Sequence, residues 1–205
     1  MQQTGIEQFM MLVSARRGHF QLESGHHSEL WLDLDALFAS PRRVEPFVAA
    51  LADMIRPFAP AVVCGPLVGG AFVAQLVARV LDTDFCFTER MPREEDGLYQ
   101  TRYRLPAAFV DRVHGRRVAI VDDVMSAGSA LRGSYDDLQT HRALPVAAGA
   151  LLVLGTVGTE FFRARQLPVV AVARDKFSLW LPEDCPLCRE GLPVEDVAAK
   201  SETMI

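Results

Sequence analysis

The chain has 205 residues, 50% of them hydrophobic, and a formal net charge of −5, which suits one domain with a substantial core. The acidic balance argues against a general binder of nucleic acid or of membrane surfaces, because both partners favour a basic face. The apolar segments 61–80 and 146–154 do not resemble membrane spans, since the longer one is interrupted by Pro66 and Arg79. No signal peptide is visible, so we expect a cytoplasmic protein.

The N-terminal residues predict a helix followed by two short strands. Four apolar residues recur there at helical spacing, namely Ile6, Phe9, Met10 and Val13. This spacing predicts an amphipathic helix over 4–16, with Thr4 as a candidate cap and Gly18 at its end. Strands are expected over 20–23 and 29–34, separated by a turn that contains two histidines.

From residue 41 onward, apolar strands alternate with amphipathic helices. Pro41 suits the first turn of a helix that runs to about Ile55. Further helices are expected over 70–81 and 130–141. Strands are expected over the apolar runs 61–64, 84–88, 118–121, 146–154 and 169–173. Continuous apolar strands that alternate with helices predict an α/β fold, with a mostly parallel sheet flanked by helices on both faces.

We expect a single domain over 1–205, because no linker divides the chain. Within it, 1–40 would form the N-terminal helix and a small hood, 41–180 the ligand-binding core, and 181–205 a C-terminal tail. Residues 90–104 carry many charges and no apolar period. They are typical of a long mobile loop, which often acts as a lid, and a solvated loop without a function is the alternative.

The run Val118–Ala130 is an apolar strand that ends in two acids, followed by small residues and hydroxyls. Ligands of open parallel sheets bind beyond the carboxyl ends of the strands, where Asp122 and Asp123 would lie. The loop N–H groups, the following helix N-terminus and the hydroxyls of Ser126 and Ser129 can surround a phosphate. The acids would face Mg²⁺ or ribose hydroxyls, which predicts a sugar phosphate as the ligand. The alternative is a helix cap, which needs only one acid.

This run resembles the motif by which type I phosphoribosyltransferases bind phosphoribosyl pyrophosphate (PRPP), with serines in place of two threonines. The resemblance implies a homologous fold in which the loop holds the 5-phosphate and the two acids contact the ribose hydroxyls. The implied PRPP-binding residues of this loop are Val124, Met125, Ser126, Ala127, Gly128, Ser129 and Ala130.

The resemblance covers nearly the whole chain and is strongest to orotate phosphoribosyltransferases. Residues 20–25 are similar to their N-terminal motif, 64–71 to their pyrophosphate-contacting loop and 87–90 to the strand before their catalytic loop. The implied residues of the pyrophosphate loop are Pro66, Leu67, Val68, Gly69 and Gly70. The tail 180–191, with its Cys-Pro-Leu-Cys sequence, resembles that of a bacterial branch of these enzymes.

Several positions depart from the orotate enzymes. The loop that begins at Arg90 has three acids and no lysine up to Gly97, although lysines are usual there. Gly69 and Glu23 stand where lysines are common in the pyrophosphate loop and the N-terminal motif. An Asp-Arg pair usually follows the strand that ends near Leu154, and this chain has glycine and threonine instead. The residues implied to bind PRPP therefore match the orotate enzymes better than the residues implied to hold orotate do.

The implied reaction is displacement of pyrophosphate from C1 of PRPP by a ring nitrogen of orotate, which gives orotidine 5′-monophosphate in pyrimidine biosynthesis. Arg90 is the expected catalytic cation beside the catalytic acids Asp122 and Asp123, and Mg²⁺ is the expected cofactor. Arg93 would add charge from the loop, as arginine suits diphosphate oxygens. Arg102 and Arg104 are alternatives to Arg93. The other interpretation of Arg90 is a surface salt bridge with Glu89 or Glu94.

Trp31 and His26 are the candidates to contact the base. Their alternatives are core packing for Trp31 and, for both His26 and His27, exposed positions in a polar turn. Cys64 and Cys86 lie in apolar runs and are expected to be buried. The pair Cys185-x-x-Cys188 would bind zinc if a histidine or a second subunit completed the ligands, or would form a redox pair. Packing of the tail is the favoured interpretation, so no side chain is assigned as a metal ligand.

Two further functions stay open. The same site would serve a transferase for another nucleobase, because the orotate arginine is absent. It would also serve a regulator that binds PRPP or a nucleotide without turnover, which the lysine-poor loop favours. A zinc- or thiol-dependent assembly protein is a third, weaker interpretation. The expected partners are PRPP, a nucleobase and a second copy of the chain in a homodimer.

Overall fold

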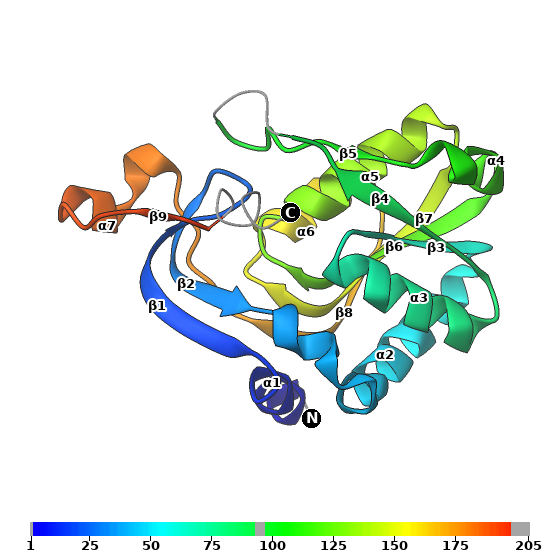
Figure 1. Cartoon of the computed structure of the whole chain (residues 1–205), viewed down its shortest axis with the longest axis horizontal. Coiled ribbons are helices and arrows are strands. Elements are labelled where there is room, and N and C mark those ends of the chain that lie inside the picture. Colours follow the sequence, from blue (N-terminus) through cyan, green and yellow to red (C-terminus); the bar gives the residue numbers. More distant parts are fainter. Residues whose placement is uncertain (1, 93–96, 198–205) are drawn as a thin grey trace.

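The computed structural model describes residues 2–92 and 97–197, which form two sheets with flanking helices (Figure 1). The larger sheet has six strands in the order β5-β4-β3-β6-β7-β8. These strands are β3 (Val62–Pro66), β4 (Asp84–Arg90), β5 (Tyr103–Arg104), β6 (Arg117–Met125), β7 (Leu144–Leu154) and β8 (Val169–Asp175). Neighbouring strands are parallel except β4 and β5, which are antiparallel. The predicted α/β fold with a mostly parallel sheet is confirmed.

Helices cover both faces of this sheet (Figure 1). One side carries α1 (Gln2–Met10), α2 (Pro41–Ile55) and α3 (Gly69–Leu81), and the other carries α4 (Val110–Val113), α5 (Ser129–Thr140) and α6 (Val157–Arg163). Alternate residues of β6 enter the two cores, with Ala119 and Val121 on the α2–α3 side and Val118 and Ile120 on the α5 side. Because both faces are buried, the central parts of β3, β6 and β7 are continuous apolar runs.

A smaller sheet forms the hood and joins the two ends of the chain. Its strands are β1 (Ser14–Gln21), β2 (His27–Asp33) and β9 (Glu195–Asp196), with β1 in the middle. β1 is antiparallel to β2 and parallel to β9. The short helix α7 (Pro186–Arg189) lies at the outer end of this sheet, at the left of Figure 1. The C-terminal tail is therefore part of the hood. The remaining elements are 3₁₀ helices at Asp35–Ala39, Arg56–Phe58, Ala107–Phe109 and Pro182–Asp184.

The predicted end of the first helix was wrong. α1 ends at Met10, and β1 begins at Ser14 and includes Gly18. Ser14 pairs with Asp33 across the hairpin, so long-range strand pairing overrides the local helical spacing of the apolar residues. The expected irregular loop over 90–104 also ends in a short strand, β5, which pairs with β4.

Other expectations are confirmed. α2 has the predicted bounds, α3 begins one residue before the predicted start, and α5 begins and ends one residue earlier than expected. Cys64 and Cys86 are buried on neighbouring strands. Within the described residues, every helix is too short or too polar to cross a membrane.

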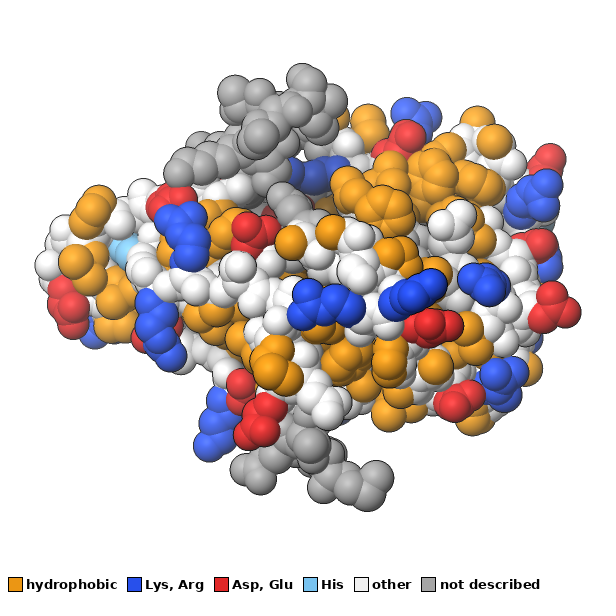
Figure 2. Space-filling view, turned by 60° about the horizontal axis from the view of Figure 1, so that its bottom comes forward, with side chains coloured by type: hydrophobic (Ala, Val, Ile, Leu, Met, Phe, Trp, Pro, Cys, Tyr) orange, Lys and Arg blue, Asp and Glu red, His pale blue; other side chains and the backbone are white. Residues whose placement is uncertain are grey.

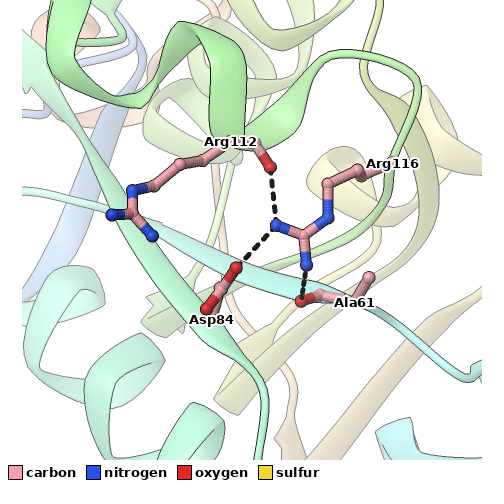
Figure 3. A network of polar contacts seen from close by, with 4 residues as sticks. All are labelled: Ala61, Asp84, Arg112 and Arg116. Carbon is pink, nitrogen blue, oxygen red and sulfur yellow. Dashed lines mark hydrogen bonds and ion pairs between the residues drawn. The ribbon is translucent and has the colours of Figure 1, made fainter.

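A polar network ties β4 to the segments before β3 and β6 (Figure 3). Arg116 Nη1 donates to Asp84 Oδ2 at 2.6 Å and to the Arg112 carbonyl at 3.1 Å, while Nη2 donates to the Ala61 carbonyl at 3.1 Å. The hydrogen bond from Arg116 lowers the pKa of Asp84, which is therefore ionised at neutral pH. Both side chains are more than a third exposed, so solvent screening limits this pair to about 1 kcal/mol.

Candidate active site

Asp122 and Asp123 lie near the carboxyl end of β6, and both side chains are buried. The Asp123 N–H donates to Asp122 Oδ1 at 3.0 Å, and the Val124 N–H donates to Asp123 Oδ1 at 2.7 Å. Burial, followed by the negative charge of Asp123, raises the pKa of Asp122 well above its ordinary value. Two adjacent buried carboxylates favour a ligand that offsets their repulsion, either a cation or hydroxyl donors.

The loop between β3 and α3 closes over these acids because two of its residues lack side chains. A Cβ on Gly69 would collide with the Asp123 carboxylate, and one on Gly70 would lie 2.7 Å from Asp122 Oδ1. Only glycine allows the first turn of α3 to approach the carboxylates so closely. The structure thus places the predicted pyrophosphate loop, 66–70, against the acid pair. The Leu67–Val68 peptide in this loop is cis.

The predicted phosphate loop connects β6 to the first turn of α5. Gly128 has a φ of 77°, a left-handed conformation that favours glycine, and α5 begins at the next residue. The Ser126 carbonyl accepts a hydrogen bond from the Gly158 N–H at 3.0 Å, which fastens the loop to α6. The first N–H groups of α5 have no partner within their own helix, so this end of the helix can bind an anion.

A cavity of 270 Å³ lies between the phosphate loop and the hood. Its lining residues come from the hood, the ends of the core strands and the tail, and they are Leu22, Glu23, Leu30, Trp31, Leu32, Leu34, Arg90, Val124, Ser126, Leu154, Phe177 and Val197. The cavity therefore brings together four predicted site residues, Trp31, Arg90, Val124 and Ser126. Phe177 was not predicted, although its place just after β8, at a strand carboxyl end, is a signal that would have found it.

Arg90 ends β4 and forms an ion pair with Glu23 of the hood, with 3.4 Å between Arg90 Nε and Glu23 Oε2. The Tyr103 hydroxyl donates to Glu23 Oε1 and Oε2 at 3.1 and 3.0 Å. Burial, followed by the charge of Glu23, raises the pKa of Tyr103 well above its ordinary value. The Arg90 and Glu23 side chains are only 20% and 28% exposed, so the pair is partly shielded from water. The sequence had suggested Glu89 or Glu94 as the partner, and Glu94 lies outside the described residues.

A second cavity, of 520 Å³, lies along α5 and is also lined by residues 99 and 101–103. Its lining includes Ser129, Arg102 and Arg132, and the Arg132 guanidinium lies 4.0 Å from the centre of the Tyr99 ring and 4.6 Å from that of Phe161. The two loop serines thus face different cavities, since Ser126 lines the smaller one. The smaller cavity is the candidate active site because Arg90, Val124 and residues of the hood line it, although the 520 Å³ cavity is larger.

His26 is not among the residues that line the smaller cavity. Its Nδ1 lies 3.1 Å from Ser24 Oγ, and its ring packs against Tyr99 with 5.4 Å between the ring centres. His26 and His27 are both buried, so the prediction that they are exposed turn residues was wrong. The Tyr99 N–H donates to the Ser24 carbonyl at 3.0 Å, which docks the described part of the charged loop on the hood. Arg93, predicted to bind PRPP, lies outside the described residues.

Comparisons with known proteins agree with this geometry. Residues 34–173 match the phosphoribosyl transferase domain family. The chain is 37% identical over 183 residues to an orotate phosphoribosyltransferase of Heliobacterium modesticaldum, with 86% of each chain covered. The crystal structure of orotate phosphoribosyltransferase from Aeropyrum pernix gives a TM-score of 0.63 at 20% identity and covers 85% of this chain and 93% of that one. The crystal structure of adenine phosphoribosyltransferase from Rhodothermus marinus gives a TM-score of 0.66 at 18% identity and covers 84% of this chain and 99% of that one. The two structures establish the fold and do not distinguish the base.

Proposed function

The chain belongs to the phosphoribosyl transferase family, and from this premise we propose that it transfers the phosphoribosyl group of PRPP to orotate. The products would be orotidine 5′-monophosphate and pyrophosphate, in pyrimidine biosynthesis. The observation that carries the proposal is the smaller cavity, where Trp31 of the hood, Arg90 and Ser126 of the phosphate loop line one space. A sugar phosphate anchored at that loop would present C1 to a base held under the hood.

The PRPP half of the site fits its ligand. The loop from Val124 to Ala130 would donate N–H groups to the 5-phosphate, and Asp122 and Asp123 would accept from the ribose hydroxyls. The same carboxylates are suitable ligands for Mg²⁺, which would neutralise the pyrophosphate oxygens. Gly69 and Gly70 would bring the α3 N-terminus to the pyrophosphate. These roles are consistent with the close approach of the loop to the acid pair.

The part of the cavity under the hood would hold the base for the displacement of pyrophosphate. A ring nitrogen of the base would form a bond to C1 while the C1–O bond to pyrophosphate breaks and its electrons stay on the leaving oxygen; the proton of that nitrogen would pass to the pyrophosphate. Arg90 is the single arginine or lysine among the described residues that line the cavity, so it would stabilise the departing charge or the orotate carboxylate. Either anion would compete with Glu23 for the guanidinium. The hood and the docked loop would exclude water from PRPP.

A transferase for another nucleobase is the second candidate. The observation that favours it is the Glu23 carboxylate on the cavity wall, beside a single arginine. A carboxylate there repels the carboxylate of orotate and would accept a hydrogen bond from an exocyclic amino group instead. The proposal of orotate rests on the similarity to orotate enzymes, so the base must be tested directly.

Trp31→Ala is expected to raise KM for the base by about tenfold or more and to leave KM for PRPP nearly unchanged. Trp31 lines the hood side of the cavity, and stacking of a base on an aromatic ring contributes about 1–3 kcal/mol. Steady-state kinetics with each substrate varied in turn measure the two constants. Leu144→Ala, at an exposed residue near the amino end of β7, is the matched control. An equal rise in both KM values would contradict this assignment of the base site.

We also propose a homodimer in the cytoplasm. Figure 2 shows hydrophobic side chains gathered among Lys and Arg side chains on one face of the molecule. Among the large hydrophobic residues, Val68, Phe72 and Val80, on or beside α3, are 65%, 46% and 42% exposed. Exposed apolar groups of this kind are typical of a protein interface. None of the four cysteines, all of which lie in the described residues, forms a disulfide, which fits a reducing compartment.

A further inference from the structure

Two histidines and two cysteines from opposite ends of the chain converge at the outer end of the hood. They are His19 on β1, His27 at the start of β2, and Cys185 and Cys188 at α7. One ligand atom from each, two imidazole nitrogens and two sulfurs, lies within 4.8 Å of all the others. None of the four lines either cavity at the phosphate loop, so this cluster is separate from the proposed active site.

The distances between the four ligand atoms fit the tetrahedral coordination of one metal ion. His19 Nε2 lies 3.0 Å from His27 Nδ1, 3.4 Å from Cys185 Sγ and 3.7 Å from Cys188 Sγ. Cys188 Sγ lies 3.3 Å from His27 Nδ1. Zinc binds sulfur at about 2.3 Å and imidazole nitrogen at about 2.0 Å, so the ligand atoms of a tetrahedral site are about 3.3–3.8 Å apart. Four of the six distances among these atoms, 3.0–3.7 Å, are close to this spacing, and the other two are within 4.8 Å.

The surrounding hydrogen bonds orient the ligands. His19 Nδ1 donates to the Leu192 carbonyl at 2.9 Å, so in the neutral ring the lone pair of Nε2 faces the sulfurs. Metal-bound histidines commonly make such a bond with their other nitrogen. The backbone of His27 exchanges two hydrogen bonds of 2.9 Å with Trp180, the residue that leads into the tail. The His19 ring and the His27 backbone are therefore held in place by contacts that do not involve a metal.

The chemistry of the four groups selects the ion. Two thiolates balance the charge of one divalent ion and the two imidazoles bind it as neutral ligands, which suits a site where His19, His27 and Cys185 are buried. Two sulfur and two nitrogen ligands in a tetrahedron favour zinc over the oxygen-seeking Mg²⁺. A full set of four protein ligands leaves no position for water or substrate, which is typical of a structural site.

We propose that His19, His27, Cys185 and Cys188 bind a structural zinc ion that fastens the C-terminal tail to the hood. The tail pairs with β1 through β9, and Val197, just after β9, lines the cavity under the hood. The ion would thus hold part of the roof of that cavity. A site of this kind supplies folding energy, so its loss would loosen the tail and the hairpin together.

Metal analysis of the tag-free full chain, expressed with added zinc, tests this proposal. We expect one zinc per chain, retained on desalting, and cobalt substitution should give the visible absorption of tetrahedral cobalt bound to thiolates. Cys188→Ser changes an exposed thiol and is expected to lower zinc content at least tenfold and to lower the melting temperature. His27→Gln serves as a second variant if the first fails to fold. His114→Ala, at an exposed histidine on another element, should keep the full zinc content.

Three results would overturn the proposal. One is wild-type protein that stays free of metal after expression with added zinc, with the exposed Cys188 open to alkylation. Another is a disulfide between these two cysteines in freshly purified protein, which would mark a redox pair. The third is a full zinc content in folded Cys188→Ser and His27→Gln variants, which would place the metal elsewhere. Metal content is measured without turnover, so these outcomes do not depend on which base the enzyme uses.

Discussion

The variant Asp122→Asn/Asp123→Asn is expected to lower kcat/KM for PRPP by about 10²–10³-fold. The two carboxylates are the buried anionic groups at the end of β6, and asparagine keeps their size while removing their charge. A neutral amide binds Mg²⁺ and ribose hydroxyls more weakly than a carboxylate does. Steady-state kinetics with PRPP varied at saturating base measure the change. Unchanged kcat/KM in the folded variant would show that the acids do not bind the ligand and serve only as a helix cap.

Asp122→Asn alone should stabilise the fold, although it removes a group proposed to bind PRPP. The pKa of Asp122 is raised in the folded protein, so its stabilising contribution is complete below the unfolded pKa of about 3.9 and is lost as pH rises through the folded pKa. At neutral pH folding must either bury this charge or take up a proton, and both oppose folding. We therefore expect Asp122→Asn alone to increase the free energy of unfolding by about 1 kcal/mol at neutral pH, and by less near pH 4. Urea unfolding at the two pH values tests this sign.

Gly69→Ala is expected to reduce kcat/KM by about 100-fold with little change in the melting temperature. The new methyl group would collide with the Asp123 carboxylate, so the carboxylate or the α3 N-terminus must move, and a displacement of about 1 Å can cost that much in rate. Gly5→Ala is the matched control, because a Cβ there would have ordinary contact with only the Val172 carbonyl, at 3.8 Å. The control should retain full activity.

A double-variant cycle tests whether Gly69 acts through Asp123. If the methyl group works by displacing that carboxylate, adding Gly69→Ala to Asp123→Asn should cost much less than it costs in the wild type. Fully additive losses would instead mean that the methyl group blocks the pyrophosphate itself. Wild-type activity in Gly69→Ala would contradict the proposed approach of the loop to the acid pair.

Local signals allowed the core elements to be predicted well. Pro41 marks the start of α2, and the glycines at 69 and 70 mark the start of α3, so these helices have nearly the predicted bounds. β1 could not be predicted in the same way, because Ile6 to Val13 keep a helical spacing. Its strand begins where pairing with Asp33 supplies backbone hydrogen bonds, and that pairing depends on residues far along the chain.

The site was predictable where its residues are neighbours in sequence. The acids and the phosphate loop form one continuous motif, and the structure keeps them together at the end of β6. The Arg90–Glu23 pair joins the end of β4 to the turn between β1 and β2, and no local pattern selects Glu23 over Glu89. The cluster of His19 and His27 with the cysteine pair could not be predicted for the same reason, because the histidines lie more than 160 residues from the cysteines in sequence. Tertiary packing, and not local pattern, brings these groups together.

Pyrophosphate release from PRPP and Mg²⁺, with orotate first and then a panel of other nucleobases, tests the central claim most directly. We predict release with orotate, with orotidine 5′-monophosphate formed in equal amount, and loss of both in Asp122→Asn/Asp123→Asn. Release only with another base would keep the transferase and reassign its substrate. If the wild-type protein bound PRPP but released no pyrophosphate with any base, the proposed enzyme activity would be contradicted, and a regulatory binding protein would account for the site instead.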